Sequence, residues 1–249
     1  MICPKAILFD LDETLSESFQ PLQPEMLKRL SRLAALRPVA IISGAGFARI
    51  EQDVLAHFPA PERLYLFPNS STQCYLFKNG TWQMEYNLSL TEDERAHIKD
   101  ALEELLVELP LLKETPHYGI QISDREAQVA FTAVGLDAPA DIKRDWDPDQ
   151  SKRRTLVEHL QKKIPDFDIL IGGASTIDVT HKGVNKTHGV RWFAGRLQIP
   201  VEQMLYVGDA LYPGGNDYVV IETGVQTRST SGPQETQGII DELLAACSA

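Results

Sequence analysis

Short, uninterrupted apolar runs are the main feature of the hydrophobic pattern, and they occur at residues 6–9, 39–42 and 204–207. Apolar residues without alternation predict strands that are buried on both faces, as in a parallel sheet. Apolar residues at helical spacing follow the first two runs, at 24–36 and 47–57. This order of strand, helix and strand predicts an α/β domain with a parallel sheet.

The pattern changes in the middle of the chain. Residues 91–109 form a long, acidic amphipathic helix, and alternating strands follow it. The other elements expected there are strands at 119–123, 128–134, 168–172 and 177–180 and a helix at 151–163. Hairpin strands with helices on one side predict an α+β module inserted into the α/β domain. We place this module at residues 83–182, which leaves 1–82 and 183–249 as the core domain.

Further elements complete the expected core domain. They are a strand at 63–67, a hairpin of 74–77 and 81–82 around Asn79-Gly80, a helix from 183 to 197, a strand at 219–221 and a helix at 235–246. An Asn-Gly pair between two strand-like runs is typical of a tight hairpin turn.

Candidate chemistry begins where the first apolar run ends, at Asp10 and Asp12. Ligands of parallel sheets bind beyond the carboxyl ends of the strands. Two carboxylates so close repel each other unless a cation relieves them, and Mg²⁺ is the cation that we expect. In a phosphoryl transfer Asp10 would attack phosphorus, and Asp12 would give a proton to the leaving oxygen. The alternative is a charged exit from a strand, since acidic turns are common.

The second run ends in a similar way, at Ser43 and Gly44, before the next helical stretch. Backbone N–H groups in such a strand-to-helix turn point at an anion, so this turn is a candidate phosphate site. Glycine-rich turns without a ligand are also common. Lys186, near the start of a later helix, is a candidate phosphate clamp, although from local sequence alone it would be a solvated lysine.

The third run ends in Gly208 and Asp209, with Asn216 and Asp217 a few residues later. Carboxylate and amide oxygens at a strand end are the ligands that Mg²⁺ prefers. A structural loop could carry the glycines of this segment, but it would not need the whole set of oxygen ligands.

Composition limits the possible functions. The 249 residues are 43% hydrophobic and carry a formal net charge of -11, which argues against nucleic-acid or anionic-membrane binding. No apolar run approaches the roughly 20 residues of a membrane span, and the start of the chain is unlike a signal peptide. We therefore expect a cytoplasmic protein. The scattered residues Cys3, Cys74 and Cys247 are expected to be reduced thiols.

The segment 10–14 resembles the D-x-D-G-T signature of the haloacid dehalogenase superfamily of phosphotransferases, with Glu13 in place of the usual glycine. Ser43, Lys186 and the segment 209–217 resemble its other three motifs in the same order. The resemblance implies a Rossmann-like core with a parallel sheet and an α+β cap of the C2B type, as in the IIB branch. It also implies the following site. Asp10 and Asp12 would be catalytic, Ser43, Gly44 and Lys186 would bind phosphate, and Asp10, Asp12, Asp209, Asn216 and Asp217 would hold Mg²⁺.

Within that branch the chain is most similar to the eukaryotic-type phosphomannomutases. The segments that carry this similarity are 119–125, 172–173, 177–179 and 208–217. The resemblance implies substrate contacts from Arg125, Lys143, Thr176 and Asp178.

The match is poorer for the arginines with which those mutases hold a second phosphate. Phe19 and Leu136 stand where the mutases have arginine, and Lys143, or alternatively Arg144, stands at a third such position. Lysine keeps the charge but loses the bidentate fork of arginine. A mutase must hold a bisphosphate intermediate, whereas a phosphatase needs only water for its second step.

We therefore expect a Mg²⁺-dependent phosphatase for a small phosphorylated metabolite, such as a sugar phosphate, acting as a monomer or homodimer. A hexose phosphate mutase is the first alternative. A protein phosphatase is a second one, but the enzymes with a similar first motif lack a cap at this place in the chain. A catalytically inactive binding module is a third, against which the complete set of motif residues argues.

Overall fold

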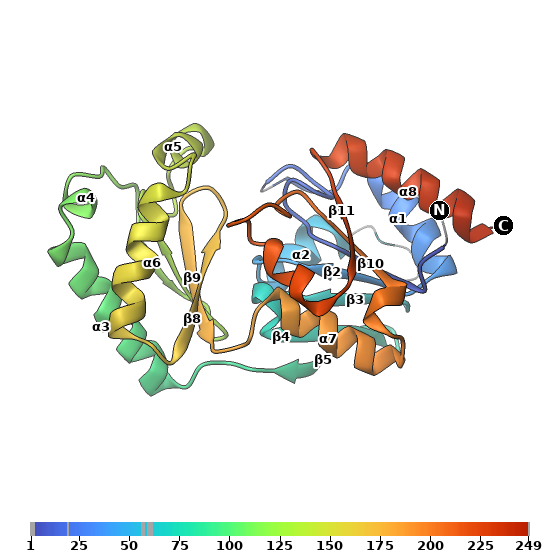
Figure 1. Ribbon diagram of the computed structural model, residues 1–249, viewed down its shortest axis with the longest axis horizontal. Coiled ribbons are helices and arrows are strands. Elements are labelled where there is room, and N and C mark those ends of the chain that lie inside the picture. The colour runs from blue at the N-terminus through green and yellow to red at the C-terminus, as the bar shows by residue number, and fades with distance from the viewer. Residues whose placement is uncertain (1–2, 19, 56–57, 59–61, 249) are drawn as a thin grey trace. The chain divides into compact units, whose positions relative to one another are not determined.

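The computed structural model describes residues 3–18, 20–55, 58 and 62–248, and the chain divides into two compact units. The first unit comprises Met1–Asn87 and Lys186–Ala249, and the second comprises Leu88–Asn185. Both boundaries fall a few residues after the expected positions 83 and 182. Helices and strands of both units are labelled in Figure 1 where there is room.

The first unit is built on a seven-stranded sheet of order β11-β10-β1-β2-β3-β4-β5. Its strands are β1 (Ala6–Phe9), β2 (Val39–Ile42), β3 (Leu64–Phe67), β4 (Gln73–Lys78), β5 (Thr81–Asn87), β10 (Met204–Gly208) and β11 (Gln226–Ser229). β1 pairs in parallel with both β10 and β2, whereas β4 and β5 are antiparallel additions at one edge. The carboxyl ends of β1, β2 and β10 therefore meet at one end of the sheet.

Helices cover both faces of this sheet. They are α1 (Pro24–Leu36), α2 (Phe47–Asp53), α7 (Lys186–Leu197) and α8 (Pro233–Ser248), with short 3₁₀ turns η2 (Asn69–Ser71), η3 (Val201–Gln203) and η4 (Tyr218–Thr223). Ile7 and Phe9 pack on the side of α1 and α8, which lie side by side (Figure 1), while Ala6 and Leu8 pack on the side of α7. Burial of successive residues on opposite faces explains the uninterrupted apolar run of β1.

Two sequence-based expectations for this unit were wrong, and one strand was not predicted. Residues 219–221 lie in η4 and not in a strand, because only Val220 of this run is fully buried while Ile221 is exposed. The strand at this edge is β11, whose mostly exposed polar side chains leave no apolar run in the sequence. α2 ends at Asp53, before the expected limit at 57, and residue 57 lies outside the described residues.

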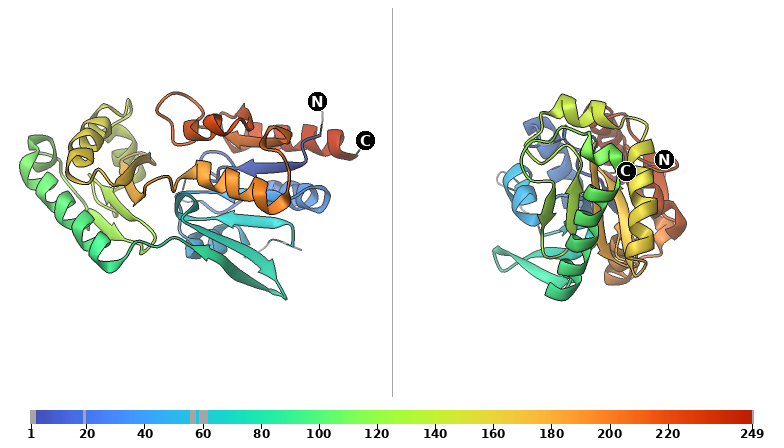
Figure 2. Two further views of the ribbon diagram at one scale, coloured as in Figure 1. Left: turned by 60° about the horizontal axis from the view of Figure 1, so that its bottom comes forward. Right: turned by 90° about the vertical axis from the view of Figure 1, so that its left-hand side faces the viewer.

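The second unit has a four-stranded antiparallel sheet of order β6-β7-β9-β8. Its elements are α3 (Glu92–Glu108), α4 (Pro110–Lys113), β6 (Ile122–Asp124), β7 (Val129–Thr132), α5 (Ala140–Trp146), α6 (Ser151–Lys163), β8 (Phe167–Gly172) and β9 (Thr176–His181). α3 and α6 lie side by side against one face of this sheet (Figure 2), and their apolar residues form the core of the unit. The α/β class with a second α+β module is thereby confirmed.

The expectation of reduced cysteines was wrong for two of the three residues. Cys3 and Cys247 form a disulfide, with their Cα atoms 5.0 Å apart, and it joins the segment before β1 to the end of α8. Spacing in the sequence carries no signal for a pair 244 positions apart. Cys74 is a buried free thiol in β4. Among the described residues, no helix is long and apolar enough to cross a membrane.

Candidate active site

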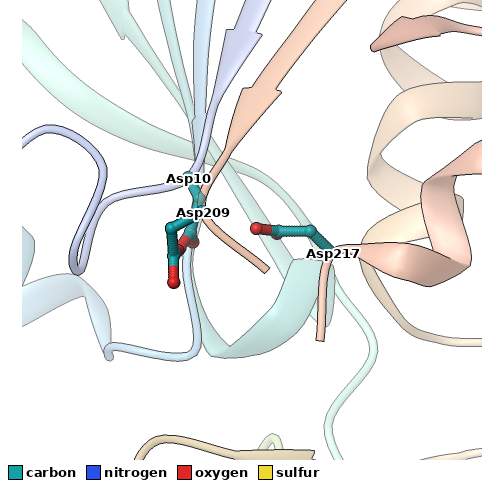
Figure 3. A group of neighbouring side chains, drawn as sticks. All are labelled: Asp10, Asp209 and Asp217. Carbon is teal, nitrogen blue, oxygen red and sulfur yellow. The ribbon is translucent and has the colours of Figure 1, made fainter. Parts of the chain in front are cut away.

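Three buried or half-buried carboxylates lie together at the carboxyl end of the parallel strands (Figure 3). Asp10 follows β1, Asp209 follows β10, and Asp217 precedes η4, where it points toward the other two. One oxygen from each lies within 4.8 Å of the others. The parallel register of β1 with β10, Phe9 opposite Val207, places the first two side by side.

Lys186, the first residue of α7, joins two of these carboxylates. Its Nζ donates to Oδ1 of Asp10 at 2.7 Å and to Oδ1 of Asp217 at 2.6 Å. The lysine side chain is 4% exposed, so the contact is shielded from water. Asp217 also accepts from the Tyr206 hydroxyl at 2.5 Å and from the backbone N–H of Ala210 at 3.2 Å. Asp217 is thus fixed from three directions.

The site carries more negative than positive charge, because one ammonium faces three carboxylates. Burial raises the pKa of Asp10 well above its usual value, against the effect of Lys186, and Asp217 raises it further. Burial and the neighbouring Asp217 likewise raise the pKa of Asp209 to about 6. Burial opposes the charged form of Lys186, but the two carboxylates outweigh it and raise its pKa. A cation at this place would relieve the repulsion.

The donor set fits a hard divalent cation such as Mg²⁺, which takes oxygen ligands. Besides the three carboxylates, the amide oxygen Oδ1 of Asn216 is buried and accepts no hydrogen bond within the described part of the chain. An unpartnered buried oxygen costs free energy, so a ligand in this position would compensate it. Asp209 is itself oriented by Thr14, whose Oγ1 donates to its Oδ1 at 3.3 Å and accepts from its N–H at 3.1 Å.

Asp12 was also predicted as a metal ligand, and its carboxylate pairs with the guanidinium of Arg49, at 2.5 Å from Nη2 to Oδ1 and 3.1 Å from Nη1 to Oδ2. Its side chain is therefore not part of the group of three carboxylates. Arg49, which lies on α2, presents its guanidinium to the loop that carries Asp12.

Glu13 occupies a left-handed backbone conformation with φ of 57°. Glycine adopts this conformation without penalty, whereas another residue pays roughly 1–2 kcal/mol. The Glu13 side chain offsets part of this cost, because its Oε1 accepts from the backbone N–H of Ser18 at 3.0 Å. The loop thus keeps the shape that glycine would give it.

Ser43 and Gly44 follow β2, and Ser43 is 1% exposed. The Ser43 hydroxyl accepts from the backbone N–H of Ala45 at 3.0 Å, and its carbonyl accepts from the N–H of Ser70 at 2.8 Å. Ser70 belongs to the 69–71 turn, whose three residues all have positive φ. A buried, strained turn therefore supports the loop that carries Ser43.

The candidate substrate residues all lie in the second unit. Thr176 and Asp178 are two positions apart on β9, so their side chains share a face of the sheet. Asp178 accepts from Gln128 Nε2 at 3.3 Å, and Thr176 bonds the hydroxyl of Thr132 at 3.2 Å. Burial raises the pKa of Asp178 to about 6, although Arg125 acts against this rise.

Lys143 directs its ammonium into its own unit, because Nζ donates to the carbonyl of Leu136 at 2.7 Å. Phe19, the other departure from the mutases, lies outside the described residues.

Several residues of the site were missed by sequence reasoning. Tyr206 sits within an apolar run and was assigned to a buried strand, and Arg49 was not singled out in the sequence. In the second unit, the basic run of Lys152, Arg153 and Arg154 has the sequence of a solvated helix face, but Arg153 is 3% exposed. Its guanidinium binds Asp147 at 2.9 Å and the carbonyl of Gly173 at 2.5 Å. The contacts of Arg49 with Asp12 and of Arg153 with Gly173 join segments 37 and 20 positions apart, and local sequence gives no signal for them.

Known proteins resemble this chain over most of its length. The sequence model of the eukaryotic phosphomannomutase family matches residues 26–246. Phosphomannomutase of Spinacia oleracea is 25% identical over 243 residues, which are 95% of this chain and 94% of that protein. Phosphomannomutase of Schizosaccharomyces pombe is 22% identical over 243 residues, which are 92% of this chain and 90% of that protein.

Solved structures show the same fold. An N-terminally truncated, IMP-bound IMP-nucleotidase of Plasmodium falciparum superposes with a TM-score of 0.70 at 16% identity, over 97% of this chain and 68% of that chain. A trehalose-6-phosphate phosphatase related protein gives a TM-score of 0.58 at 16% identity, over 96% of this chain and 97% of that chain. Together with the family match, these similarities show that the chain belongs to the eukaryotic phosphomannomutase family, within the haloacid dehalogenase superfamily of phosphoryl-transfer enzymes.

Proposed function

We propose that the protein is a Mg²⁺-dependent phosphatase that hydrolyses a small phosphorylated metabolite, such as a sugar phosphate, through an aspartyl-phosphate intermediate. The choice of a phosphatase over a mutase rests on two residues of the second unit. Leu136 stands at a position where the mutases have arginine, and Lys143, at a second one, binds the carbonyl of Leu136. Without a strong grip on a remote phosphate, a bisphosphate intermediate would be lost, whereas hydrolysis does not need that grip.

Asp10 is the proposed nucleophile. Its Oδ1 accepts from Lys186, which leaves Oδ2 to form the bond to phosphorus while the ester P–O bond breaks. Asp12 gives a proton to the leaving alkoxide. Water then attacks the aspartyl phosphate, Asp12 takes its proton, and Asp10 and inorganic phosphate are released.

Charge on the phosphoryl oxygens would be balanced by Lys186 and by the backbone at Ser43 and Gly44. Mg²⁺ would be held by Asp10, Asp209, Asn216 and Asp217, and it would supply charge neutralisation of the phosphoryl group. The second unit, as a cap, would exclude water and select the leaving group. Arg125, Thr176 and Asp178 are the proposed substrate contacts there.

A hexose phosphate mutase is the second candidate, and the names of the curated relatives favour it. One assay separates the two candidates. Hexose 1-phosphate is incubated with Mg²⁺, with and without a hexose bisphosphate, and both free phosphate and the 6-phosphate isomer are measured.

Release of free phosphate that is lost in Asp10→Asn would support the phosphatase. Isomer formed faster than phosphate would overturn it in favour of the mutase. Neither product across a wide panel of phosphoesters would favour a non-catalytic binding module.

A further inference from the structure

Tyr206 carries a polar group into an otherwise apolar strand. It lies in the middle of β10 and belongs to the apolar cluster on the side of α7 that also contains Leu8 and Phe193. Its side chain is fully buried. A phenylalanine would fill the same space, because the ring makes the apolar contacts. A buried hydroxyl costs free energy unless it is hydrogen-bonded, so the partner of this hydroxyl indicates what it contributes.

The partner is the carboxylate of Asp217. The Tyr206 hydroxyl donates to Oδ1 of Asp217 at 2.5 Å, and the same oxygen accepts from Lys186 Nζ at 2.6 Å. The backbone N–H of Ala210 donates to Oδ2 at 3.2 Å. Hydrogen bonds to both oxygens fix the plane of the carboxylate as well as its position. Donors in and just after β10 thus fix the oxygen that binds Lys186.

The backbone at Gly208 leaves room for this contact. A Cβ atom at Gly208 would lie 2.3 Å from Oδ2 of Asp217 and 3.0 Å from Cε1 of Tyr206. Both distances are shorter than an ordinary van der Waals contact, so a side chain at this position would displace the carboxylate or the ring. Because Gly208 has no side chain, Asp217 can lie against β10, where the hydroxyl reaches it.

The contact extends to Asp10 through Lys186. Nζ of Lys186 also donates to Oδ1 of Asp10, at 2.7 Å. A lysine ammonium sits on a flexible stem, so its acceptors determine where it lies. The side chains of Asp10, Lys186 and Asp217 are at most 5% exposed, which shields these hydrogen bonds from water. Oδ1 of Asp217 is therefore one of the acceptors that fix the ammonium beside Asp10.

We propose that Tyr206 is a positioning residue, whose hydroxyl holds Asp217 and thereby keeps the Lys186 ammonium where charge develops on the phosphoryl group. This inference rests on the roles that the proposed function gives to Asp10 and Lys186. Tyr206 itself would touch neither phosphorus nor the substrate. A displaced ammonium would neutralise the phosphoryl oxygens less well in the transition state, so the loss should appear in catalysis more than in substrate binding.

Tyr206→Phe provides the test, because it removes the hydroxyl and keeps the ring. Hexose 1-phosphate with Mg²⁺ is the substrate, and free phosphate and the 6-phosphate isomer are both counted as product. We expect kcat to fall about 10-fold while KM stays within about twofold of wild type, as for an interaction made in the transition state. Loss of a group that itself contacts the reacting oxygens costs more, roughly 10²–10³-fold.

Two inhibitors separate positioning from a purely structural effect. Orthovanadate takes the five-coordinate geometry of a phosphoryl group in transfer, whereas inorganic phosphate resembles a bound ground state. In Tyr206→Phe the inhibition constant of orthovanadate should rise by about the factor by which kcat falls, and that of phosphate by less than about twofold.

Tyr65→Phe is the matched control. It removes the hydroxyl of a half-buried tyrosine on β3 of the same sheet, whose ring packs against Phe193 with the ring centroids 4.8 Å apart. This variant should change neither kcat nor the two inhibition constants. Melting curves show whether both variants fold like wild type.

A lower melting temperature of Tyr206→Phe with unchanged kcat and unchanged inhibition by orthovanadate would overturn the inference, since the hydroxyl would then only stabilise the fold. Equal losses of affinity for orthovanadate and phosphate would also overturn it. Both results would leave the proposed function in place, because Asp10→Asn tests that function separately. Wild-type protein that forms neither product would overturn both, since Lys186 would then serve no reaction.

Discussion

Lys186 is the residue on which the charge balance of the site depends. Its ammonium lies between the carboxylates of Asp10 and Asp217, and all three side chains are almost wholly buried. Removing one partner of a buried ion pair leaves uncompensated charge, which is far more costly than the pair itself is favourable. The contacts of Lys186 with Asp10 and Asp217 would therefore matter both for the chemistry of the site and for the stability of the core domain.

Replacing this lysine should separate the two effects. Lys186→Met should abolish phosphate release and lower the free energy of unfolding by about 3–5 kcal/mol. Urea denaturation measures the loss of stability, and added Mg²⁺ should recover part of it. Lys78→Met is the control, because Lys78 pairs with Glu85 on the surface of the same unit. A loss in Lys186→Met no larger than in the control would contradict a buried, charge-balancing role.

Asp178 gives a prediction for pH. Burial raises its pKa to about 6 in the folded protein, from 3.8 for the exposed group. An acid with a raised folded pKa stabilises the fold below its unfolded pKa, and this contribution is lost as the pH rises through the folded value. Asp178→Asn should therefore match wild type near pH 3.5 and exceed it near pH 7.5 by about 1–3 kcal/mol.

Urea denaturation of wild type and Asp178→Asn between these pH values measures the difference. Asp166→Asn, on the exposed loop before β8, controls for the loss of a carboxylate from the same unit. A constant difference between wild type and Asp178→Asn across the range would show that Asp178 is ionised alike in both states.

At the scale of elements, the strands that the sequence predicted best are those whose apolar pattern has a single cause, namely burial on both faces. β1, β2 and β10 are buried on both faces, so their apolar runs stand out, and polar residues mark their ends. The Asn79-Gly80 turn was predictable because both residues adopt positive φ, which this pair tolerates. β11 was missed because an edge strand can be polar, and its pairing with β10 depends on backbone groups that any residue supplies.

The residues of the site also divide into those that the sequence predicts and those that it does not. The positions of Asp10, Ser43 and Asp209 follow from strand ends and could be anticipated. The partners of Asp12 and Lys143 could not be anticipated. Each of these side chains could bond to any of several donors or acceptors, and only the folded chain brings the actual partner near. Arg153 is a third such residue, since its position in α6 is compatible with either a solvated or a buried guanidinium.

Arg153 ties α6 to the turn between β8 and β9. It binds Asp147 in a pair that is almost fully buried and donates to the carbonyls of Gly172 and Gly173. Arg153→Ala should lower the free energy of unfolding by about 3–5 kcal/mol, because Asp147 would be left buried without its cation. Thermal or urea denaturation measures this. Arg154→Ala, the exposed neighbour, should change stability by less than about 0.5 kcal/mol, and comparable losses in both variants would contradict the assignment.

At the scale of the whole molecule, the disulfide closes almost the entire chain into a loop. A crosslink between residues 244 positions apart restricts the unfolded chain strongly. Reduction of wild type should therefore lower the free energy of unfolding by about 2–4 kcal/mol. The measurement is a melting curve with and without a thiol reductant. Cys247→Ser should melt like reduced wild type and be insensitive to reductant, and an equal effect of reductant on both proteins would argue against the bond.

The same disulfide holds the segment before β1 close to the end of α8, so the elements could also follow one another in a different order along the chain. With the Cα atoms of Cys3 and Cys247 only 5.0 Å apart, a peptide of a few residues could replace the sulfur bridge and turn the chain into a ring. Such a ring could be opened at another exposed turn, for instance between β4 and β5, without disturbing the strand ends that carry the carboxylates. The order of the elements along the chain, from β1 to α8, is therefore one of several orders that would place the three carboxylates at the same strand ends.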